Sequence, residues 1–447
     1  MSSPEEVLGS WVIKYTDDQK QELKPWLRCD GRGKMSYIEV SVKGARHNNE
    51  DTSFGDGRLF AVFDGHGGKF ASQLLRKKLA EHFYGSITQA ELDSPGAIEG
   101  SPPKVVQALD AAFTKSQEDM PSEFPAAQSG STGVACWVHG TNGGAAKVFA
   151  SCLGDSKALL FDMNTGVIPE MDIKTWDQEV GTLKGPGVVS ALRAETFCHN
   201  LTGALINGRD GKWASMDKDP NGVGFREFEL LAKRHSFPQS RKPYNISNMP
   251  GEERWRVLDV EPTRALGHKL KREHPLHHPE TQEWTVSDPK NSILMLSCDG
   301  FFSKEAFGSP DQVTRFLTDP VAYCKDPNLF QGTCLKALLE RLNETHKLPD
   351  PSSVDMGTLF ERIRNVVFSK LSDETWTTAY DAAFQYLRKF AQERPVPNIK
   401  THPVKTLLAA CYFAVLLVSD DNVSVLVVFL DGVQRFGGRC IDAGICP

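Results

Sequence analysis

Acidic residues stand beside apolar segments at several points of this 447-residue chain, and most of them have a glycine nearby. They are Glu50, Asp51, Asp64, Asp155, Asp299 and Asp421. A carboxylate that follows a buried strand is costly unless it meets a cation or water, and strand ends converge where sheets stack. One shared metal centre would account for these residues together.

The donor set favours a hard metal ion. Carboxylates without histidine or cysteine partners suit Mg²⁺ or Mn²⁺ better than Zn²⁺. The glycine after Asp64 lets the backbone turn sharply, so that the carbonyl of Gly65 can also reach an ion. Two ions bridged by a shared carboxylate would deprotonate a water and hold the oxygens of a phosphoryl group. This chemistry predicts hydrolysis of a phosphate ester.

Two further side chains fit the same reaction. Arg46 lies four residues before Glu50, and its planar guanidinium could bind the phosphate oxygens. His66 follows Gly65 and could protonate the leaving alkoxide. The simpler alternatives are a solvated surface arginine and a histidine that caps a helix.

Short runs rich in Val, Ile, Leu and Phe predict the strands that must position these residues. The runs lie near residues 37, 58, 132, 147, 157, 292 and 422. Apolar residues at helical spacing predict helices over 68–83 and 103–117. Turns such as HGTNGGAAK at 139–147 and GDSK at 154–157 favour antiparallel hairpins. Together these elements predict an α+β fold in layers.

Two stretches interrupt this pattern. Residues 166–255 are rich in Gly, Pro and charge, which is typical of a long loop or insertion. Residues 310–395 contain helical patterns at 332–347 and 378–393, separated by a proline-bearing linker. The longest apolar run, 407–418, is shorter than the roughly 18 residues of a membrane span, so we expect a buried helix there.

Seven motifs, read in order, resemble the metal-dependent protein phosphatases of the 2C type. They are RHNNED (46–51), LFAVFDGHGG (59–68), SGSTGVACWV (129–138), LGDSKALLF (153–161), TRALGH (263–268), ILMLSCDGFF (293–302) and DNVSVLVVF (421–429). The resemblance implies a four-layer α-β-β-α sandwich, in which two antiparallel sheets are flanked by helices. It also implies a serine/threonine protein phosphatase, a hydrolase of phosphoric monoesters in which activated water attacks phosphorus.

The resemblance assigns roles to the candidate residues. Asp64 would bridge two Mg²⁺ or Mn²⁺ ions, with the Gly65 carbonyl and Glu50 on one ion. Asp299 and Asp421 would serve the other ion, and Asp155 a weak third one. Asp51 would orient the attacking water, Arg46 would hold phosphate, and His66 would act as general acid.

The chain departs from the family pattern at two positions and in the flap-like region before TRALGH, which lacks the family's DHKP-type segment. Ser303 stands where an Asp usually supports the third metal, and His268 stands where the usual RALGD motif has its Asp. These departures prompt an alternative, in which the chain is a catalytically weak or inactive scaffold or regulatory protein. A third interpretation is hydrolysis of a small phosphorylated metabolite, because the chemistry lies at the phosphoryl group.

Composition limits the partners and the compartment. A formal net charge of -6 without a Lys/Arg block argues against nucleic acid as a partner. Ten cysteines without a CxxC pair, and no recognisable signal or lipidation motif, suggest a reduced, cytoplasmic protein without a membrane anchor, and the nucleus stays open. We expect a monomer that acts on phosphorylated proteins. The expected domains are an extension at 1–34, a phosphatase domain at 35–433 with insertions at 166–255 and 310–395, and a tail at 434–447.

Overall fold

A computed structural model describes residues 26–29, 35–93 except 45, 47 and 57, 102–140, 145–162, 262–269, 277–301, 307, 310–325, 355–368, 374–417 and 421–430, together with short strands between 173 and 256. The predicted helix at 332–347, the departure at Ser303 and most of 166–255 lie outside these residues.

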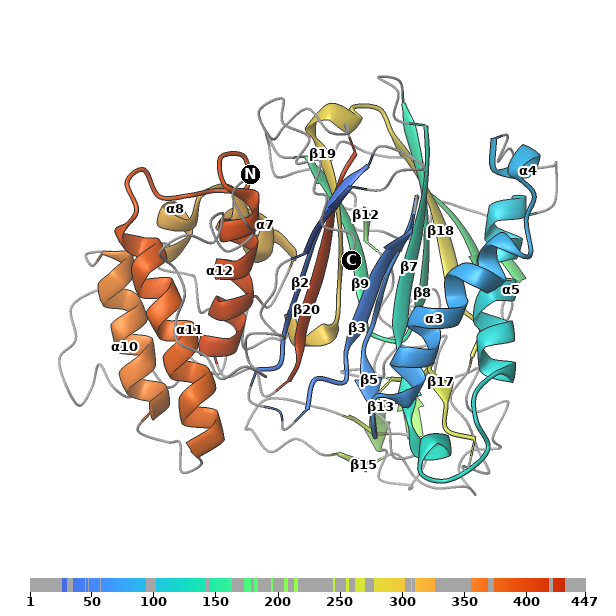
Figure 1. The fold of residues 1–447 in the computed structure, drawn as a ribbon, viewed down its shortest axis with the longest axis horizontal. Coiled ribbons are helices and arrows are strands. Elements are labelled where there is room, and N and C mark those ends of the chain that lie inside the picture. Colours follow the sequence, from blue (N-terminus) through green and yellow to red (C-terminus); the bar gives the residue numbers. More distant parts are fainter. Residues whose placement is uncertain are drawn as a thin grey trace.

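Two antiparallel sheets stack face to face in the centre of the molecule (Figure 1). The first has the order β1 (Trp26–Cys29), β2 (Ser36–Val42), β20 (Val423–Phe429), β19 (Ser292–Ser297), β9 (Lys157–Asp162) and β12 (Ala194–Glu195). The second has the order β11 (Gly181–Leu183), β10 (Ile173–Asp177), β18 (Glu280–Val286), β8 (Ala146–Leu153), β7 (Gly133–Gly140), β4 (Leu59–Phe63) and β3 (Thr52–Asp56). We call them the six-stranded and the seven-stranded sheet.

Strand β4 shows why the central strands are apolar throughout. Side chains alternate between the faces of a strand. Phe60 and Val62 pack in the core between the sheets, whereas Leu59, Ala61 and Phe63 pack under the helices on the outer face. Both faces are buried, so the sequence reads as a continuous apolar run rather than as an alternating one.

Helices α3 (Phe70–Tyr84) and α5 (Lys104–Glu118) cover the outer face of the seven-stranded sheet, with the short α4 (Gln89–Asp93) between them in the chain. In α3, Ala71, Leu75, Leu79 and Phe83 recur every fourth residue and are buried in the core beneath the helices. This spacing places them along one face of the helix.

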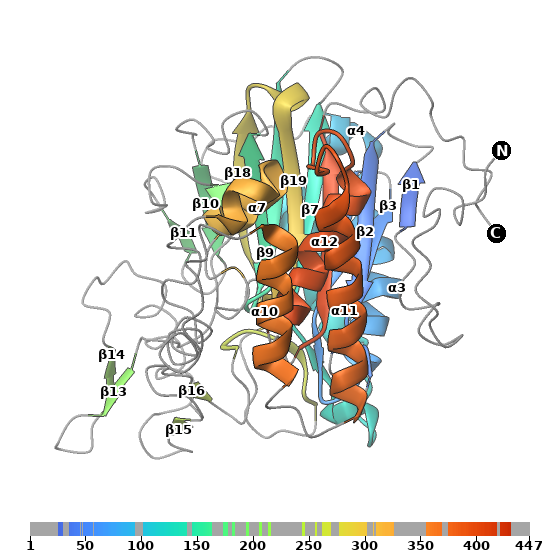
Figure 2. The same cartoon turned by 90° about the vertical axis from the view of Figure 1, so that its left-hand side faces the viewer.

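A second helical layer covers the six-stranded sheet and faces the viewer in Figure 2. It consists of α7 (Pro310–Thr318), α8 (Pro320–Cys324), α10 (Met356–Phe368), α11 (Glu374–Gln392) and α12 (Pro403–Leu416). Helix α12 lies between the sheet and the other helices, which explains why its apolar residues occupy all of its faces. The run at 407–418 is therefore a core helix as predicted, and no described helix has the length and apolarity to cross a membrane.

The structure confirms the α+β prediction and the four-layer α-β-β-α sandwich. The strands predicted near 37, 58, 132, 147, 157, 292 and 422 correspond to β2, β4, β7, β8, β9, β19 and β20. The predicted helices at 68–83, 103–117 and 378–393 correspond to α3, α5 and α11. The described helices of 310–395 contribute to the outer layer, while the proposed domain boundaries stay a prediction.

One hairpin prediction was wrong. The turn at 139–147 does join the antiparallel pair β7 and β8. The turn GDSK at 154–157 instead connects β8 in the seven-stranded sheet to β9 in the six-stranded sheet. A short polar turn permits either connection, because the pairing of the next strand depends on distant partners. The chain therefore crosses between the sheets at Asp155.

Three small sheets complete the described strands. The pairs β13 (Leu205–Asn207) with β14 (Trp213–Ser215), and β15 (Tyr244–Asn245) with β16 (Trp255–Arg256), are antiparallel. The third sheet has the order β17 (Leu266–Gly267), β6 (Gly130–Ser131) and β5 (Gly65–His66). This β17-β6-β5 sheet brings together three segments that are remote in the chain, because Ser131 pairs with Gly65 on one side and with Leu266 on the other.

We predict that Phe413→Ala destabilises the fold by about 3–5 kcal/mol. Phe413 is fully buried on α12, and its ring packs against those of Phe307, Phe316 and Phe360. The free energy of unfolding should be measured by chemical denaturation, with Arg388→Ala on the half-exposed surface of α11 as the control. Equal loss in the two variants would contradict the role given to this aromatic cluster.

Candidate metal centre

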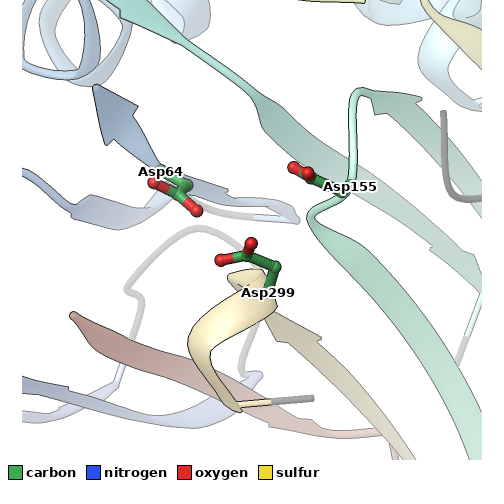
Figure 3. Close-up of side chains that lie close together, drawn as sticks. All are labelled: Asp64, Asp155 and Asp299. Carbon is green, nitrogen blue, oxygen red and sulfur yellow. The ribbon is translucent and has the colours of Figure 1, made fainter. Parts of the chain in front are cut away.

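Three aspartates from the ends of strands point at one another at one edge of the sandwich (Figure 3). Asp64 lies between β4 and β5, Asp155 in the crossover between β8 and β9, and Asp299 at the start of the 3-10 turn η4 (Asp299–Phe301), shortly after β19. Each offers a carboxylate oxygen, and these oxygens all lie within 4.8 Å of one another. We call Asp64, Asp155 and Asp299 the aspartate triad; both sheets contribute to it.

Asp51 lies beside the triad and is almost completely buried, with 7% of its surface exposed. Burial, together with repulsion from Asp421 and Asp299, raises the pKa of its carboxyl to about 7. The side chains of Ser424 and Cys298 lower the pKa in part, although neither Asp51 oxygen has a hydrogen bond of normal geometry. A buried carboxylate with so few hydrogen bonds destabilises the folded protein when it is charged.

Asp64 experiences the same repulsion from more directions. Burial raises the pKa of its carboxyl well above the ordinary value, and the charges of Asp51, Asp299, Asp421 and Asp155 raise it further. Carboxylates that converge in this way cannot all be ionised without a cation. The donor set is made of oxygens, which fits Mg²⁺ or Mn²⁺ and gives no special preference to Zn²⁺. The aspartate triad can therefore hold a metal ion.

Glu50 is fixed to this edge through its backbone. Its amide donates a hydrogen bond to Oδ1 of Asn422 at 2.9 Å, and its carbonyl accepts one from the hydroxyl of Ser72. The backbone of Gly65 packs so closely against it that a Cβ on Gly65 would lie 2.3 Å from the Glu50 carbonyl oxygen. A glycine is therefore required between Asp64 and His66.

Asp421 lies just before β20, outside the aspartate triad, yet close enough to raise the pKa values of Asp51 and Asp64. One of its carboxylate oxygens pairs with the guanidinium of Arg46 at 3.0 Å. The arginine side chain is half exposed, at 49%. Arg46 thus stands at the solvent side of the site, where a phosphate could approach.

His66 faces a second histidine. Its Nε2 lies 2.7 Å from Nε2 of His268, and the two rings are stacked with their centroids 4.8 Å apart. At this distance one nitrogen must donate a hydrogen to the other. His268 has a φ of 55°, and among the described non-glycine residues it alone has a positive φ. Such backbone strain is typical of functional sites.

Gly130 leaves room for the histidine pair because it has no side chain. In the β17-β6-β5 sheet it pairs with His66 on one side and with Gly267 on the other. A Cβ on Gly130 would lie 2.1 Å from Nε2 of His268 and 2.5 Å from Nε2 of His66. Gln117 of α5 accepts a hydrogen bond from the amide of Gly267 at 2.7 Å and thereby secures the strand before His268.

The structure thus brings three of the predicted metal ligands together and places the other candidates around them. Glu50 and Asp421 flank the triad without belonging to it, and the metal role of the Gly65 carbonyl stays a prediction. Asn422 and Gly130 lie within two of the sequence motifs, but sequence reasoning gave them no role. Asn422 donates hydrogen bonds to the carbonyls of Lys43 and Asn48, so that it ties their loop to the start of β20. Its position directly after Asp421 was the available signal.

Residues 30–171 match the family model of Protein phosphatase 2C. This range contains Arg46, Asp51, Asp64, His66 and Asp155, and it ends before Asp299 and Asp421. The resemblance predicted from the motifs is confirmed by this match. No curated protein sequence matches the chain at a significant level.

Several solved structures are similar at low sequence identity. A sex determining protein of C. elegans is 18% identical, with 89% of this chain and 65% of that chain covered and a TM-score of 0.45. A phosphatase from Toxoplasma gondii is 14% identical, with 92% and 96% covered and a TM-score of 0.42. The serine/threonine phosphatase PstP/Ppp of Mycobacterium tuberculosis is 17% identical, with 89% and 99% covered and a TM-score of 0.35. This chain therefore spans just under two thirds of the C. elegans protein.

We predict that Mg²⁺ or Mn²⁺ raises the melting temperature, and that it does so more at about pH 8 than at about pH 6. The pKa of Asp51 is raised from 3.8 to about 7 by folding. Its stabilising contribution is therefore complete below pH 3.8 and is lost as the pH rises towards 7 in the metal-free protein. A bound cation offsets this loss of stability, because it binds the carboxylates in their charged form. Melting curves with EDTA or metal should show the difference, and an equal shift at both pH values would count against it.

Gly65→Ala should weaken Mn²⁺ binding roughly tenfold or more. The added Cβ would displace the backbone of Glu50 and with it the turn that carries Asp64. Titration calorimetry on the folded variant measures this. Gly357→Ala is the matched control, since the nearest atom to its Cβ is a flexible aspartate oxygen at 3.2 Å. Unchanged affinity in Gly65→Ala would show that the close approach is unimportant.

Proposed function

Because residues 30–171 belong to the protein phosphatase 2C family, we propose that this protein hydrolyses phosphoserine and phosphothreonine in other proteins in a reaction that depends on divalent cations. The observation that carries the proposal is the aspartate triad, whose oxygens lie within 4.8 Å of one another beside the buried Asp51. Such a group of acids is destabilising in the absence of a cation.

The proposed ligands are the aspartate triad with Glu50, Asp421 and the carbonyl of Gly65 around it. When bound, two ions would acidify water, neutralise phosphoryl oxygens and orient the ester, and a third would bind weakly at Asp155. Asp51 offers carboxylate oxygens with no hydrogen bond of normal geometry, so it is suited to accept one from the attacking water. This supports its proposed role in orienting water.

Arg46 is the proposed phosphate-binding residue. Its guanidinium is paired with Asp421 in the structure, at 3.0 Å. Asp421 is also a proposed metal ligand, so in that role it would share its charge with a cation, and the half-exposed guanidinium would have donors left for the substrate. A guanidinium binds two oxygens of a phosphate with its planar fork, which fixes the orientation of the group as well as its charge.

His66 is the proposed general acid. A serine or threonine alkoxide is a poor leaving group and must receive a proton as its bond to phosphorus breaks. His268 holds Nε2 of His66 at 2.7 Å and so fixes the orientation of the ring. It occupies the position where the family motif has an aspartate, so this chain would orient its acid with a second imidazole.

One observation favours the alternative of a weakly active or inactive scaffold. The two side chains proposed to touch the substrate, Arg46 and His66, are both engaged with other side chains of the protein. A substrate would therefore compete with Asp421 for the Arg46 guanidinium and with His268 for Nε2 of His66. A monomeric state and a cytoplasmic location stay predictions alongside this proposal.

Asp64→Asn should lower turnover by at least about a hundredfold, because it removes the central ligand of the proposed cations. The assay compares a small aryl phosphate with a phosphothreonine peptide, each with and without Mn²⁺. Asp381→Asn on α11 is the matched control, since that aspartate is partly exposed and pairs with Arg364 away from the aspartate triad. Preference for the peptide supports a protein substrate over a small metabolite, whereas no turnover in the metal-loaded wild type supports the scaffold.

His66→Ala should lower hydrolysis of the phosphothreonine peptide by about 10²–10⁴-fold and affect an aryl phosphate much less. The aryl oxide leaves without a proton, so it does not need the acid. His82→Ala is the control, because His82 pairs with Asp119 on the surface at 2.8 Å. A parallel loss for both substrates would exclude the general-acid role and indicate a structural one.

A further inference from the structure

Two large apolar side chains are exposed in the described part of the protein, and both are phenylalanines. Phe70 has 49% of its surface exposed and Phe124 has 71%. Phe70 is the first residue of α3, four positions after His66. Phe124 precedes the 3-10 turn η2 (Ala126–Gln128), which leads to Gly130 between the two histidines. Both belong to segments that build the candidate site.

Hydrogen bonds of Ser129 connect these two segments. Its hydroxyl accepts from the amide of Ala71 at 3.1 Å and donates to the carbonyl of Gly68. The tight turn before it is closed by hydrogen bonds from the amides of Ala127 and Gln128 to the carbonyls of Glu123 and Pro125, at 2.9 and 3.1 Å. Figure 1 shows the start of α3 and strand β5 at the same end of the sandwich. The segments that carry the two phenylalanines therefore meet at Ser129, next to Gly130 and the histidine pair, and we call Phe70 and Phe124 the phenylalanine rim.

Charge does not explain this rim. Lys69 and Glu123, each directly before a phenylalanine, are exposed and carry opposite charges. The exposed acids Glu118 and Asp119 lie in the same segment as Glu123, so charges of both signs surround the rings, and the exposed phenylalanine is the feature that the two segments share. Large aromatic side chains are among those that most often supply binding energy to a partner.

We propose that Phe70 and Phe124 form a docking surface for an apolar side chain of the substrate, close in sequence to its phosphorylated serine or threonine. This inference rests on the proposed function and names the substrate class of that site. Four residues of chain separate His66 from Phe70 and span at most about 14 Å. An extended peptide covers that distance in about four residues, so the apolar side chain lies within four positions of the phosphorylated one.

The test is a series of phosphothreonine peptides in which one Leu is moved through the four positions on either side, against a background of Ser and Ala. The value of kcat/KM should rise roughly tenfold for one or two positions relative to a peptide without Leu. Phe70→Ser and Phe124→Ser should each reduce that ratio, and the corresponding Leu variants should retain most of it. Arg76→Ser, on the exposed face of α3, is the control.

Each outcome decides between the two proposals. A Leu preference that survives in both Ser variants, or its absence in the wild type, would overturn the docking surface while leaving the phosphatase intact. A failure to hydrolyse any peptide would overturn the proposed function and this inference with it. If sedimentation instead shows a dimer that Phe124→Ser dissociates, the rim binds a second copy of the chain and the proposal is wrong.

Discussion

The repulsion among buried carboxylates is the constraint on which the rest of the molecule depends. Asp51, Asp64 and their neighbours are held together by strand ends although burial and mutual charge raise the pKa of both acids. Only a rigid framework can impose such an arrangement, and the two sheets with their closed apolar cores supply it. The packing of Phe60 and Val62 between the sheets is thus linked directly to the chemistry at their edge.

Much of the fold and part of the site could be predicted from the sequence. The central strands are buried on both faces, so their apolar runs are unambiguous, and Asp64, Asp155 and Asp299 are recognisable beside them. The crossover at Asp155 could not be predicted, because a four-residue turn does not determine which distant strand β9 will join. The contact of His66 with His268 depends on a sheet that joins three remote segments, and no local pattern encodes it.

The β17-β6-β5 sheet connects the histidine pair with the segments that carry the two exposed phenylalanines. Ser129 and Gly130 lie between the histidine pair on one side and the start of α3 on the other. A displacement of this short segment would move the His66 ring and the phenylalanine rim together. If both proposals hold, substrate recognition and the orientation of the proposed acid would be coupled, since both depend on the hydrogen bonds of Ser129 and the strand pairing of Gly130.

The crossover at Asp155 has a consequence for folding. The aspartate triad takes one residue from the loop after β4, one from the passage between the sheets, and one from the loop after β19. No single sheet contains a complete site, so a partly folded chain with only one sheet formed has no place for the cation. The proposed metal would then bind only after both sheets have formed and packed together. Its affinity would depend on how well the two sheets are aligned.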